Sequence, residues 1–342
     1  FELNNRYENR QMPEVYSVDL REELKQGNRS ILSGILQEKI EDRLKKKEQI
    51  MLFLNRRGYA GFFSCRSCGT VMKCPHCDVS LSQHWNGKLV CHYCGYETRQ
   101  PQQCPVCGSP YIGGFRAGTQ QIEEIVKKRF PQARVLRMDL DTTRKKEGHA
   151  NILAAFANQE ADILIGTQMI VKGHDFPKVT LVGVLAADLS LNISDYRASE
   201  RTFQLLTQAA GRAGRGEKPG EAIIQTYQPE HYSIQAAMHQ DYRTFYEEEI
   251  GYRKLLGYPP ASNLLAIHGS CGNEELLETG MQYIRKFLNR VDSHGQLQII
   301  GPADETVSRI ADMYRKVIYI KQEDHQLLLR AKSRLEQYIE VN

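Results

Sequence analysis

Eight of the nine cysteines in this chain form four Cys-x-x-Cys pairs between residues 65 and 107, and this cluster constrains the fold more than any other feature. Because a tetrahedral thiolate site needs two pairs, eight sulfur ligands predict two Zn²⁺ ions. Disulfides or a redox dithiol are the alternatives, but single motifs rather than four mark redox sites. A segment this small and polar cannot build its own core, so metal binding would supply its folding free energy. The pairs are Cys65/Cys68, Cys74/Cys77, Cys91/Cys94 and Cys104/Cys107.

The spacing of the cysteines also indicates which pairs share an ion. Between Cys77 and Cys91 lies a stretch of zinc-ribbon length with a hairpin-like turn at Trp85–Lys88, so the two middle pairs should bind one ion. The two outer pairs are then left to bind the second ion. His76 and His92 could substitute as ligands, but the cysteines suffice without them.

Flat rings and cations are interleaved in this cysteine-rich stretch. Single-stranded nucleic acid stacks on such a mixture. The alternative is that the aromatic side chains only pack the small core of the module, and the sequence does not decide between the two. The rings are Phe62, Phe63, Trp85 and Tyr93, and the cations are Arg66, Lys73, Lys88 and Arg99.

On both sides of the insertion, short apolar runs alternate with amphipathic segments. The run Ile50–Leu54 is continuously apolar, as in a strand buried on both faces of a parallel sheet, and it follows a helix expected over residues 30–47. The alternation predicts a doubly wound α/β domain over residues 1–228, interrupted by a zinc-binding insertion over residues 64–110. Further helices are expected at 119–130 and 147–157, and further strands at 134–138, 163–165, 179–185 and 221–227.

Residues 229–342 are expected to form a second, smaller domain. Helical residues continue to Leu256, and Gly257-Tyr258-Pro259-Pro260 then breaks the helix, because proline lacks a backbone N–H. The following order of strand, helix, strand, strand and helix predicts a small α+β domain close to a split β-α-β arrangement. The strands are expected at 264–268, 297–300 and 317–321, and the helices at 274–291 and 325–339.

The composition is that of an ordinary globular protein. The formal net charge of +4 is compatible with a polyanionic partner without identifying one. No apolar run approaches the roughly 20 residues that a membrane-spanning helix requires, and the first residues lack an apolar signal core. We therefore expect a cytoplasmic protein with no membrane partner. The chain begins at Phe1 rather than at a methionine, and we expect it to be part of a longer protein.

Two stretches beside expected strands resemble motifs V and VI of superfamily 2 helicases. The first is Gly-Thr-Gln-Met-Ile-Val-Lys-Gly-His-Asp-Phe-Pro at residues 166–177, and the second is Gln-Ala-Ala-Gly-Arg-Ala-Gly-Arg-Gly at residues 208–216. One glycine-rich loop would be weak evidence, but the two in this order are specific. The resemblance implies that the α/β domain is the second, RecA-like lobe of a helicase motor. ATP with Mg²⁺ would then bind between this lobe and a first lobe.

The resemblance also assigns roles to residues at the nucleotide. Arg212 and Arg215 would be arginine fingers, because guanidinium groups offer planar, permanently charged donors to a γ-phosphate. Gln208 would lie nearby and help to orient the groups at the nucleotide. Gly173 and Asp175 would lie at the nucleotide, with Asp175 contacting the ribose or bracing a finger.

Other residues would contact DNA. Thr167 stands where the family places a contact to the backbone of the tracking strand, and a hydroxyl can bond phosphate whatever the base. Lys172, Arg56 and Arg57 are similar candidates. A solvated loop is the alternative for these three cations.

An eight-cysteine insertion just after Leu54–Tyr59 makes the chain resemble the PriA family of helicases in particular. The stretches Asp195–Thr202 and Leu255–Pro260 resemble the same family, so the resemblance extends over essentially the whole chain. It implies an ATP-dependent 3′-to-5′ DNA helicase that binds forked and single-stranded DNA at stalled or abandoned replication forks. With other replication-restart proteins it would start primosome assembly, and the terminal domain would bind branched DNA.

One departure from a complete motor is the absence of Gly-x-x-x-x-Gly-Lys-Ser/Thr from the sequence. We expect the first motor lobe to be missing from this chain, which should not hydrolyse ATP alone. One alternative is a non-catalytic zinc-containing scaffold that binds DNA or proteins and retains a helicase lobe. Another is a different superfamily 2 translocase with a grafted zinc ribbon. Gln208, Arg212 and Arg215 at this spacing favour a motor, because a scaffold has no need of them.

Overall fold

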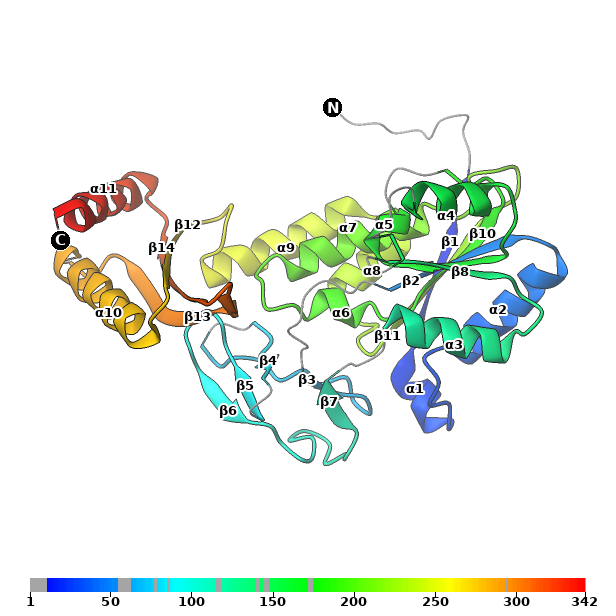
Figure 1. The fold of residues 1–342 in the computed structure, drawn as a ribbon, viewed down its shortest axis with the longest axis horizontal. Helices are drawn as coiled ribbons and strands as arrows, with labels where there is room; N and C mark the ends of the chain where they lie inside the picture. Colours follow the sequence, from blue (N-terminus) through cyan, green and yellow to red (C-terminus); the bar gives the residue numbers. More distant parts are fainter. Residues whose placement is uncertain are drawn as a thin grey trace.

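The computed structural model describes residues 11–54, 63–76, 79–84, 87–114, 118–139, 142–143, 148–171, 175–292 and 294–341. A parallel sheet with helices on both faces, which we call the motor part after the expected helicase lobe, lies at one end of the molecule. A small antiparallel sheet covered by helices, the C-terminal part, lies at the other (Figure 1). The cysteine-rich insertion lies between them, near the long helices α7 (Ala198–Ala210) and α9 (Tyr242–Leu256). Three parts of the chain therefore meet in the middle of the molecule.

The described strands of the large sheet are ordered β1-β11-β10-β2-β9-β8, and every neighbouring pair is parallel. All residues of β2 and β10 are buried, as expected of central strands with continuous apolar runs. The prediction of an α/β fold with a parallel sheet is confirmed. The strands are β1 (Glu14–Asp19), β2 (Gln49–Phe53), β8 (Val135–Met138), β9 (Ile163–Gly166), β10 (Val179–Val184) and β11 (Glu221–Thr226).

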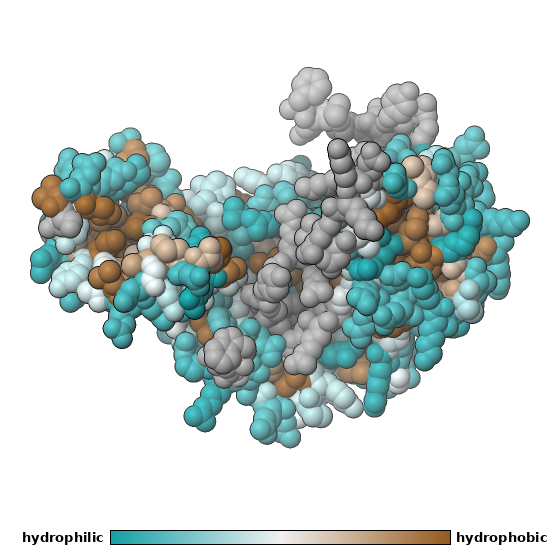
Figure 2. Space-filling view, in the orientation of Figure 1, coloured by the Kyte–Doolittle hydropathy of each residue, from teal (hydrophilic) through white to brown (hydrophobic). Residues whose placement is uncertain are grey.

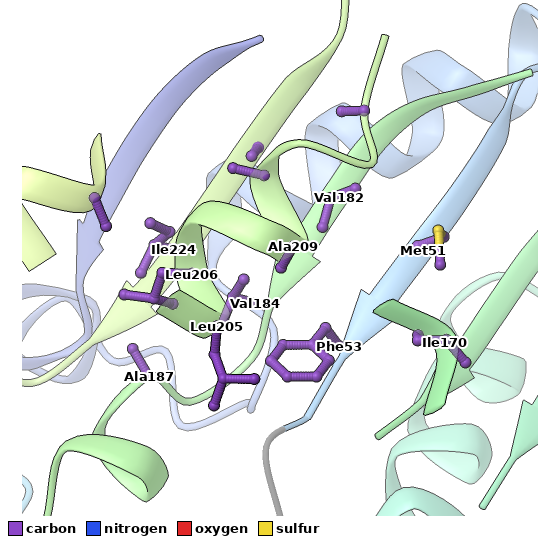
Figure 3. Packing of buried hydrophobic residues seen from close by; sticks show 14 of the residues in the cluster. Met51, Phe53, Ile170, Val182, Val184, Ala187, Leu205, Leu206, Ala209 and Ile224 are labelled. Carbon is purple, nitrogen blue, oxygen red and sulfur yellow. The ribbon is translucent and has the colours of Figure 1, made fainter. Parts of the chain in front are cut away.

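Alternate residues of β2 face two separate cores, because successive side chains of a strand point to opposite faces of the sheet. Ile50 and Leu52 belong to the core that contains apolar residues of α2 (Gly34–Lys45) and α3 (Thr119–Arg129). Met51 and Phe53 belong to the core on the other face, with Ile170 of α5 and Leu205 of α7 (Figure 3). That second core also contains Phe156 of α4 (Gly148–Ala157), and α5 spans Gln168–Val171.

Helix α8 (Tyr232–His239) and helix α9 pack on α7 of the motor part. Ile234 and Phe245 are buried in the same core as Phe53, and the Phe245 ring stacks on Phe203 of α7 with 4.3 Å between centroids. The sequence placed both helices in a second domain over residues 229–342. We propose that the boundary lies instead at Gly257, which caps α9 in the left-handed conformation that favours glycine.

The insertion leaves the parallel sheet after β2 and returns before α3. It contains two small antiparallel sheets. One pairs β3 (Phe63–Cys65) with β7 (Ile112–Gly114), and the other has the order β4-β5-β6, with β4 at Ser82–Gln83, β5 at Lys88–Val90 and β6 at Glu97–Arg99. Strands of two or three residues cannot support a core alone, which agrees with a module held together by metal.

The C-terminal part is a split β-α-β unit followed by a helix. Its described sheet has the order β12-β14-β13 with antiparallel neighbours, so β12 and β13 run parallel with β14 between them. This confirms the predicted α+β arrangement. Hydrophobic residues gather over this part in Figure 2, whereas the motor part shows a mostly hydrophilic face. The elements are β12 (Asn263–Cys271), α10 (Glu274–Val291), β13 (Gln298–Ile310), β14 (Met313–Gln322) and α11 (His325–Val341).

Several elements differ from the sequence-based expectation. Strand β1 and helix α1 (Leu20–Lys25) were not predicted, and β1 is an edge strand with a single buried residue, Val18, which gives a weak pattern. Strand β13 extends ten residues beyond the predicted end at 300, because it pairs with β14 in a long, irregular hairpin. Within the described ranges, no helix combines the length and the apolar character needed to cross a membrane.

Candidate motor site and metal centres

The outer cysteine pairs come together in one cluster. Ligand atoms of Cys65, Cys68, Cys104 and Cys107 all lie within 4.8 Å of one another. The Sγ–Sγ distance is 3.7 Å between Cys65 and Cys107 and 3.6 Å between Cys68 and Cys104. Four sulfurs around Zn²⁺, with Zn–S bonds of about 2.3 Å, would stand about 3.8 Å apart. A disulfide requires about 2.05 Å, so the donor set fits a zinc ion and not a disulfide.

Glycine forms the turn after each outer pair. Gly69 has φ +76° and donates its backbone N–H to the Cys65 carbonyl at 2.9 Å, and Gly108, with φ +68°, does the same to Cys104 at 2.9 Å. A Cβ at Gly69 would stand 2.3 Å from the Tyr227 carbonyl oxygen at the end of β11, so glycine is required there for space as well. The first cysteine turn, Cys65–Gly69, is therefore held directly against the parallel sheet.

The middle pairs form the second cluster. Ligand atoms of Cys74, Cys91 and Cys94 lie within 4.8 Å of one another, with 3.5 Å between the sulfurs of Cys74 and Cys94. The expected fourth ligand, Cys77, lies outside the described residues. His92 is buried and turned away from this cluster, because its Nδ1 is 3.0 Å from the Asp304 carbonyl oxygen of β13. The donor chemistry again fits zinc.

The aromatic rings of the module pack inward where they are described. Phe63 and Tyr93 are buried in a core with Leu81 and Leu89. This favours the packing alternative over a stacking platform for these two rings. Phe62 and Trp85 lie outside the described residues.

Thr167 lies at the carboxyl edge of the parallel sheet, directly after β9, and is partly buried. Its carbonyl accepts the backbone N–H of Ile170 at 3.1 Å as α5 begins. At the preceding Gly166, a Cβ would stand 2.8 Å from the Met138 carbonyl oxygen. The turn that carries the Thr167 hydroxyl therefore packs tightly against the sheet. The other predicted DNA contacts, Lys172, Arg56 and Arg57, fall outside the described residues, and so does Gly173.

The second motif begins where α7 ends, and glycines hold it against the start of β10. Gly214, with φ +69°, donates its N–H to the Val179 carbonyl at 3.0 Å. A Cβ at Gly216 would stand 2.2 Å from the Pro177 carbonyl oxygen. Backbone contacts this close fix the loop that carries Arg212 and Arg215.

The same contacts bring the two predicted motor stretches side by side. Arg215 Nη1 is 3.4 Å from Asp175 Oδ1, and Arg215 Nε donates to the Gly211 carbonyl at 2.9 Å. Burial, together with the charge of Arg215, lowers the pKa of Arg212, and Asp175 partly offsets this. Gln208 is exposed on the last turn of α7. Arginine and carboxylate therefore stand together at the amino edge of the sheet, opposite to Thr167.

A cleft of about 800 Å³ adjoins this edge, and its cations suit a phosphate-bearing ligand. Arg215 and Asp175 form part of its wall. The other charged residues that line it are Lys46, Lys47, Lys178, Lys218, Glu48 and Glu217.

Sequence reasoning missed Glu48, which tethers the arginine loop. Its buried carboxylate accepts the Thr180 hydroxyl at 2.6 Å and Lys218 Nζ at 2.7 Å, and it pairs with Arg43 Nε at 3.4 Å. The only sequence signal was a charged residue directly before β2. Lys218 is 170 residues away along the chain, so no local pattern could pair them.

Two family models match the chain. "Helicase conserved C-terminal domain" matches residues 114–217, which contain both candidate motor stretches. "PriA DNA helicase Cys-rich region (CRR) domain" matches residues 74–99, which contain the middle cysteine pairs.

Curated proteins named replication restart protein PriA are similar over almost the whole chain. The one from Bacillus subtilis (strain 168) is 49% identical over 340 residues, which are 98% of this chain and 42% of that protein. The one from Synechocystis sp. is 47% identical over 325 residues, 94% of this chain and 39% of that protein. The chain thus spans about two fifths of the length of these relatives.

Solved structures give weaker matches. RecG bound to a three-way DNA junction is 12% identical and covers 70% of this chain and 22% of its own, with a TM-score of 0.37. S. cerevisiae Dbp5 bound to RNA and ADP BeF3 is 11% identical and covers 72% and 45%, with a TM-score of 0.31. Scores this low carry no argument. The sequence relatives and the PriA-specific Cys-rich match carry the assignment, and this chain belongs to the PriA family.

Proposed function

We propose that the full-length protein is an ATP-dependent DNA helicase and that this chain supplies its second motor lobe. The observation that carries the proposal is the arrangement of Arg212 and Arg215 beside Asp175 at the edge of the parallel sheet. Two guanidinium groups held by a fixed backbone can stabilise the charge that develops during phosphoryl transfer. A carboxylate next to them can brace a finger or contact the ribose.

In this proposal the nucleotide lies between two lobes. A phosphate-binding loop on the other lobe would hold ATP and Mg²⁺, and Arg212, Arg215 and Gln208 would complete the site when the lobes close. Gly173 and Asp175 would lie at the same nucleotide. The chemistry that ATP supplies is phosphoryl transfer to water, and the residues of this chain orient and neutralise the phosphates.

DNA would bind at the opposite edge of the sheet. Thr167 would donate its hydroxyl to a backbone phosphate, and Lys172, Arg56 and Arg57 would add sequence-independent charge. Contacts of this kind suit a protein that moves along a strand. The separation of Thr167 from Arg215 across the sheet supports two different ligands at the two edges.

The finer assignment is a 3′-to-5′ helicase that binds forked or single-stranded DNA at stalled or abandoned replication forks and starts primosome assembly with other replication-restart proteins. It is supported by the similarity to relatives named replication restart proteins. The C-terminal part would bind branched DNA. Two Zn²⁺ ions would hold the insertion, one on Cys65, Cys68, Cys104 and Cys107 and the other on Cys74, Cys77, Cys91 and Cys94.

Arg215→Ala in the full-length protein tests the motor role. Loss of the finger should lower the DNA-stimulated rate of ATP hydrolysis at least about 100-fold, because one guanidinium contributes about 10³-fold or more in related phosphoryl transfers. The affinity for single-stranded DNA should stay within about twofold of the wild type. Phosphate release and fluorescence anisotropy measure the two quantities.

Arg243→Ala is a matched control, because Arg243 is an exposed arginine on α9 and belongs to neither motif. It should leave hydrolysis unchanged. If Arg215→Ala also hydrolyses ATP at the wild-type rate, the motor proposal is wrong and a zinc-containing binding scaffold takes its place.

A further inference from the structure

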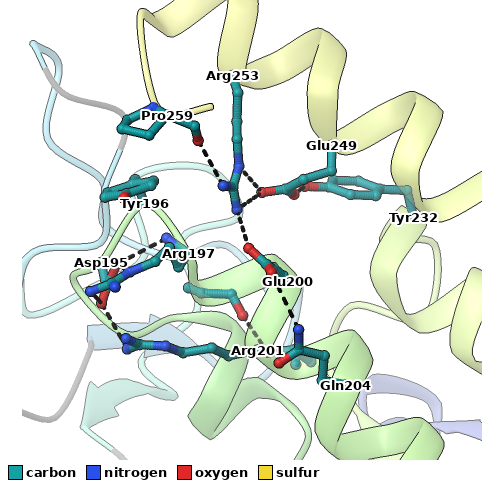
Figure 4. Close-up of polar contacts among 12 residues, drawn as sticks. Asp195, Tyr196, Arg197, Glu200, Arg201, Gln204, Tyr232, Glu249, Arg253 and Pro259 are labelled. Atoms are coloured by element: carbon teal, nitrogen blue, oxygen red, sulfur yellow. Dashed lines mark hydrogen bonds and ion pairs between the residues drawn. The ribbon is translucent and has the colours of Figure 1, made fainter. Parts of the chain in front are cut away.

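Arg253 joins three segments where the motor part meets the C-terminal sheet (Figure 4). Its side chain is only 9% exposed. Nε donates to Glu249 of α9 at 2.7 Å, Nη1 donates to the Pro259 carbonyl at 2.7 Å, and Nη2 donates to Glu200 of α7 at 2.6 Å. The guanidinium also lies over the Tyr196 ring, 5.4 Å from its centroid. A buried ion pair is weak evidence for stability, but these contacts connect α9, α7 and the turn at Pro259 through one side chain.

The turn that Arg253 holds is part of a junction of tyrosines. Tyr258 stacks on Tyr196 of the motor part with 4.8 Å between centroids, and Lys321 Nζ of β14 lies 3.6 Å from the centre of the Tyr258 ring. Tyr93 of the cysteine-rich module stacks on Tyr319 of β14 at 4.8 Å. Because packed rings do not deform continuously, a shift of the C-terminal sheet must displace this junction.

A polar stripe leads from the junction to the candidate fingers. Glu200, Gln204, Gln208 and Arg212 follow at intervals of four residues along α7 and the turn after it, so each neighbouring pair shares a side of the helix. Glu200 Oε1 accepts Gln204 Nε2 at 3.2 Å, while its other oxygen accepts Arg253. Glu200 therefore links Arg253 to the first step of the stripe.

We propose that Arg253, acting through Glu200, is a positioning residue that couples DNA binding by the C-terminal part to the orientation of α7 and its arginine pair. The proposal rests on the proposed function, since the coupling requires that Arg212 and Arg215 serve ATP hydrolysis. Helix α7 starts beside the junction at Ala198 and ends at Ala210, directly before the arginine loop. A displacement of its first turn is therefore carried to the loop by a rigid element.

Glu200→Gln in the full-length protein tests the coupling. This change weakens the contact with α7 and leaves Arg253 its bonds to Glu249 and Pro259. The rate of ATP hydrolysis without DNA and the affinity for branched DNA should stay within about twofold of the wild type. The rate at saturating branched DNA should fall about five- to tenfold, because branched DNA bound by the C-terminal part no longer orients α7. Glu200→Asp, which keeps the carboxylate, should retain at least half of the stimulation.

Two further variants separate coupling from damage to the fold. Arg253→Gln should reproduce the loss of stimulation, and combining it with Glu200→Gln should add nothing, because both changes break one link. Glu247→Gln alters an exposed ion pair on the same helix α9, and DNA should stimulate its ATP hydrolysis as fully as that of the wild type.

If DNA stimulates ATP hydrolysis by Glu200→Gln as strongly as it stimulates the wild type, the coupling is wrong but the proposed function is not. A proportional fall of the rates with and without DNA would also overturn the coupling, because that pattern marks a merely structural role. No ATP hydrolysis by the wild-type protein would instead overturn the proposed function, and the coupling with it.

Discussion

Asp188 is fully buried at the carboxyl edge of the parallel sheet, where it holds the end of β11. Its carboxylate accepts the backbone N–H of Tyr227 at 3.0 Å and the Thr226 hydroxyl at 3.2 Å. Burial raises the pKa of Asp188 to about 6, although the hydrogen bonds from Tyr227 and Thr226 favour the ionised form. The ordinary value is 3.8. Between these two values the folded protein binds a proton that the unfolded chain has released.

The sign of this shift predicts a pH dependence. A raised carboxyl pKa means that the contribution of Asp188 to the free energy of unfolding falls as the pH rises from about 4 to about 6, and is constant above that. Relative to Asp188→Asn, the wild type should therefore gain roughly 1–2 kcal/mol of stability on going from pH 7 to pH 5. Urea unfolding of both proteins at the two pH values measures this, and a difference that does not change with pH would contradict it.

At the scale of elements, the cysteine-rich module consists of short hairpins whose knuckles face one another in pairs. Strands of two or three residues bury little surface, so we expect metal binding by the thiolate clusters to supply most of the stabilisation. Cys271 differs in kind, because it lies in β12 and packs against the core of the C-terminal part. The metal content of the protein therefore tests the two predicted zinc sites, and Cys271 provides a control.

Zinc analysis by mass spectrometry should find two equivalents per wild-type chain. Cys74→Ser should lower the content to about one, because a site with three thiolates binds zinc much more weakly than a site with four. In the full-length protein this change should impair unwinding more than ATP hydrolysis. Cys271→Ser is the control and should retain two equivalents. Two equivalents in Cys74→Ser would exclude that cysteine as a ligand.

At the scale of the whole molecule, we propose that the candidate nucleotide site is one half of a site. Arg212, Arg215 and Asp175 line one edge of the parallel sheet, and the sequence contains no Gly-x-x-x-x-Gly-Lys-Ser/Thr to hold the phosphates. Finger residues can lower a barrier only when another group has positioned the nucleotide.

We therefore predict that this chain alone does not hydrolyse ATP at a measurable rate, with or without single-stranded DNA. Phosphate release is the measurement, and the full-length protein under the same conditions is the positive control. DNA-stimulated turnover by the isolated chain that disappears in Arg215→Ala would contradict the prediction.

The sequence by itself predicted the features that depend on local spacing. The paired cysteines, the buried strands and helix α10, whose observed bounds equal the predicted 274–291, each follow from residue types at short intervals. The split β-α-β unit followed from the order of its elements. Motif spacing also identified Arg212 and Arg215 as candidates, although their role stays a prediction.

Only the tertiary structure decided which distant residues meet. Strand β1 was missed because an edge strand buries little and pairs with β11 about 200 residues later. Three contacts join segments whose sequences contain no pattern that predicts the contact. They are the packing of Tyr93 against Tyr319, the contact of Arg253 with Glu200 and the contact of Glu48 with Lys218. Spacing along the chain specifies the period of an element and the ligands of a metal, but a contact between elements depends on how their faces pack in three dimensions.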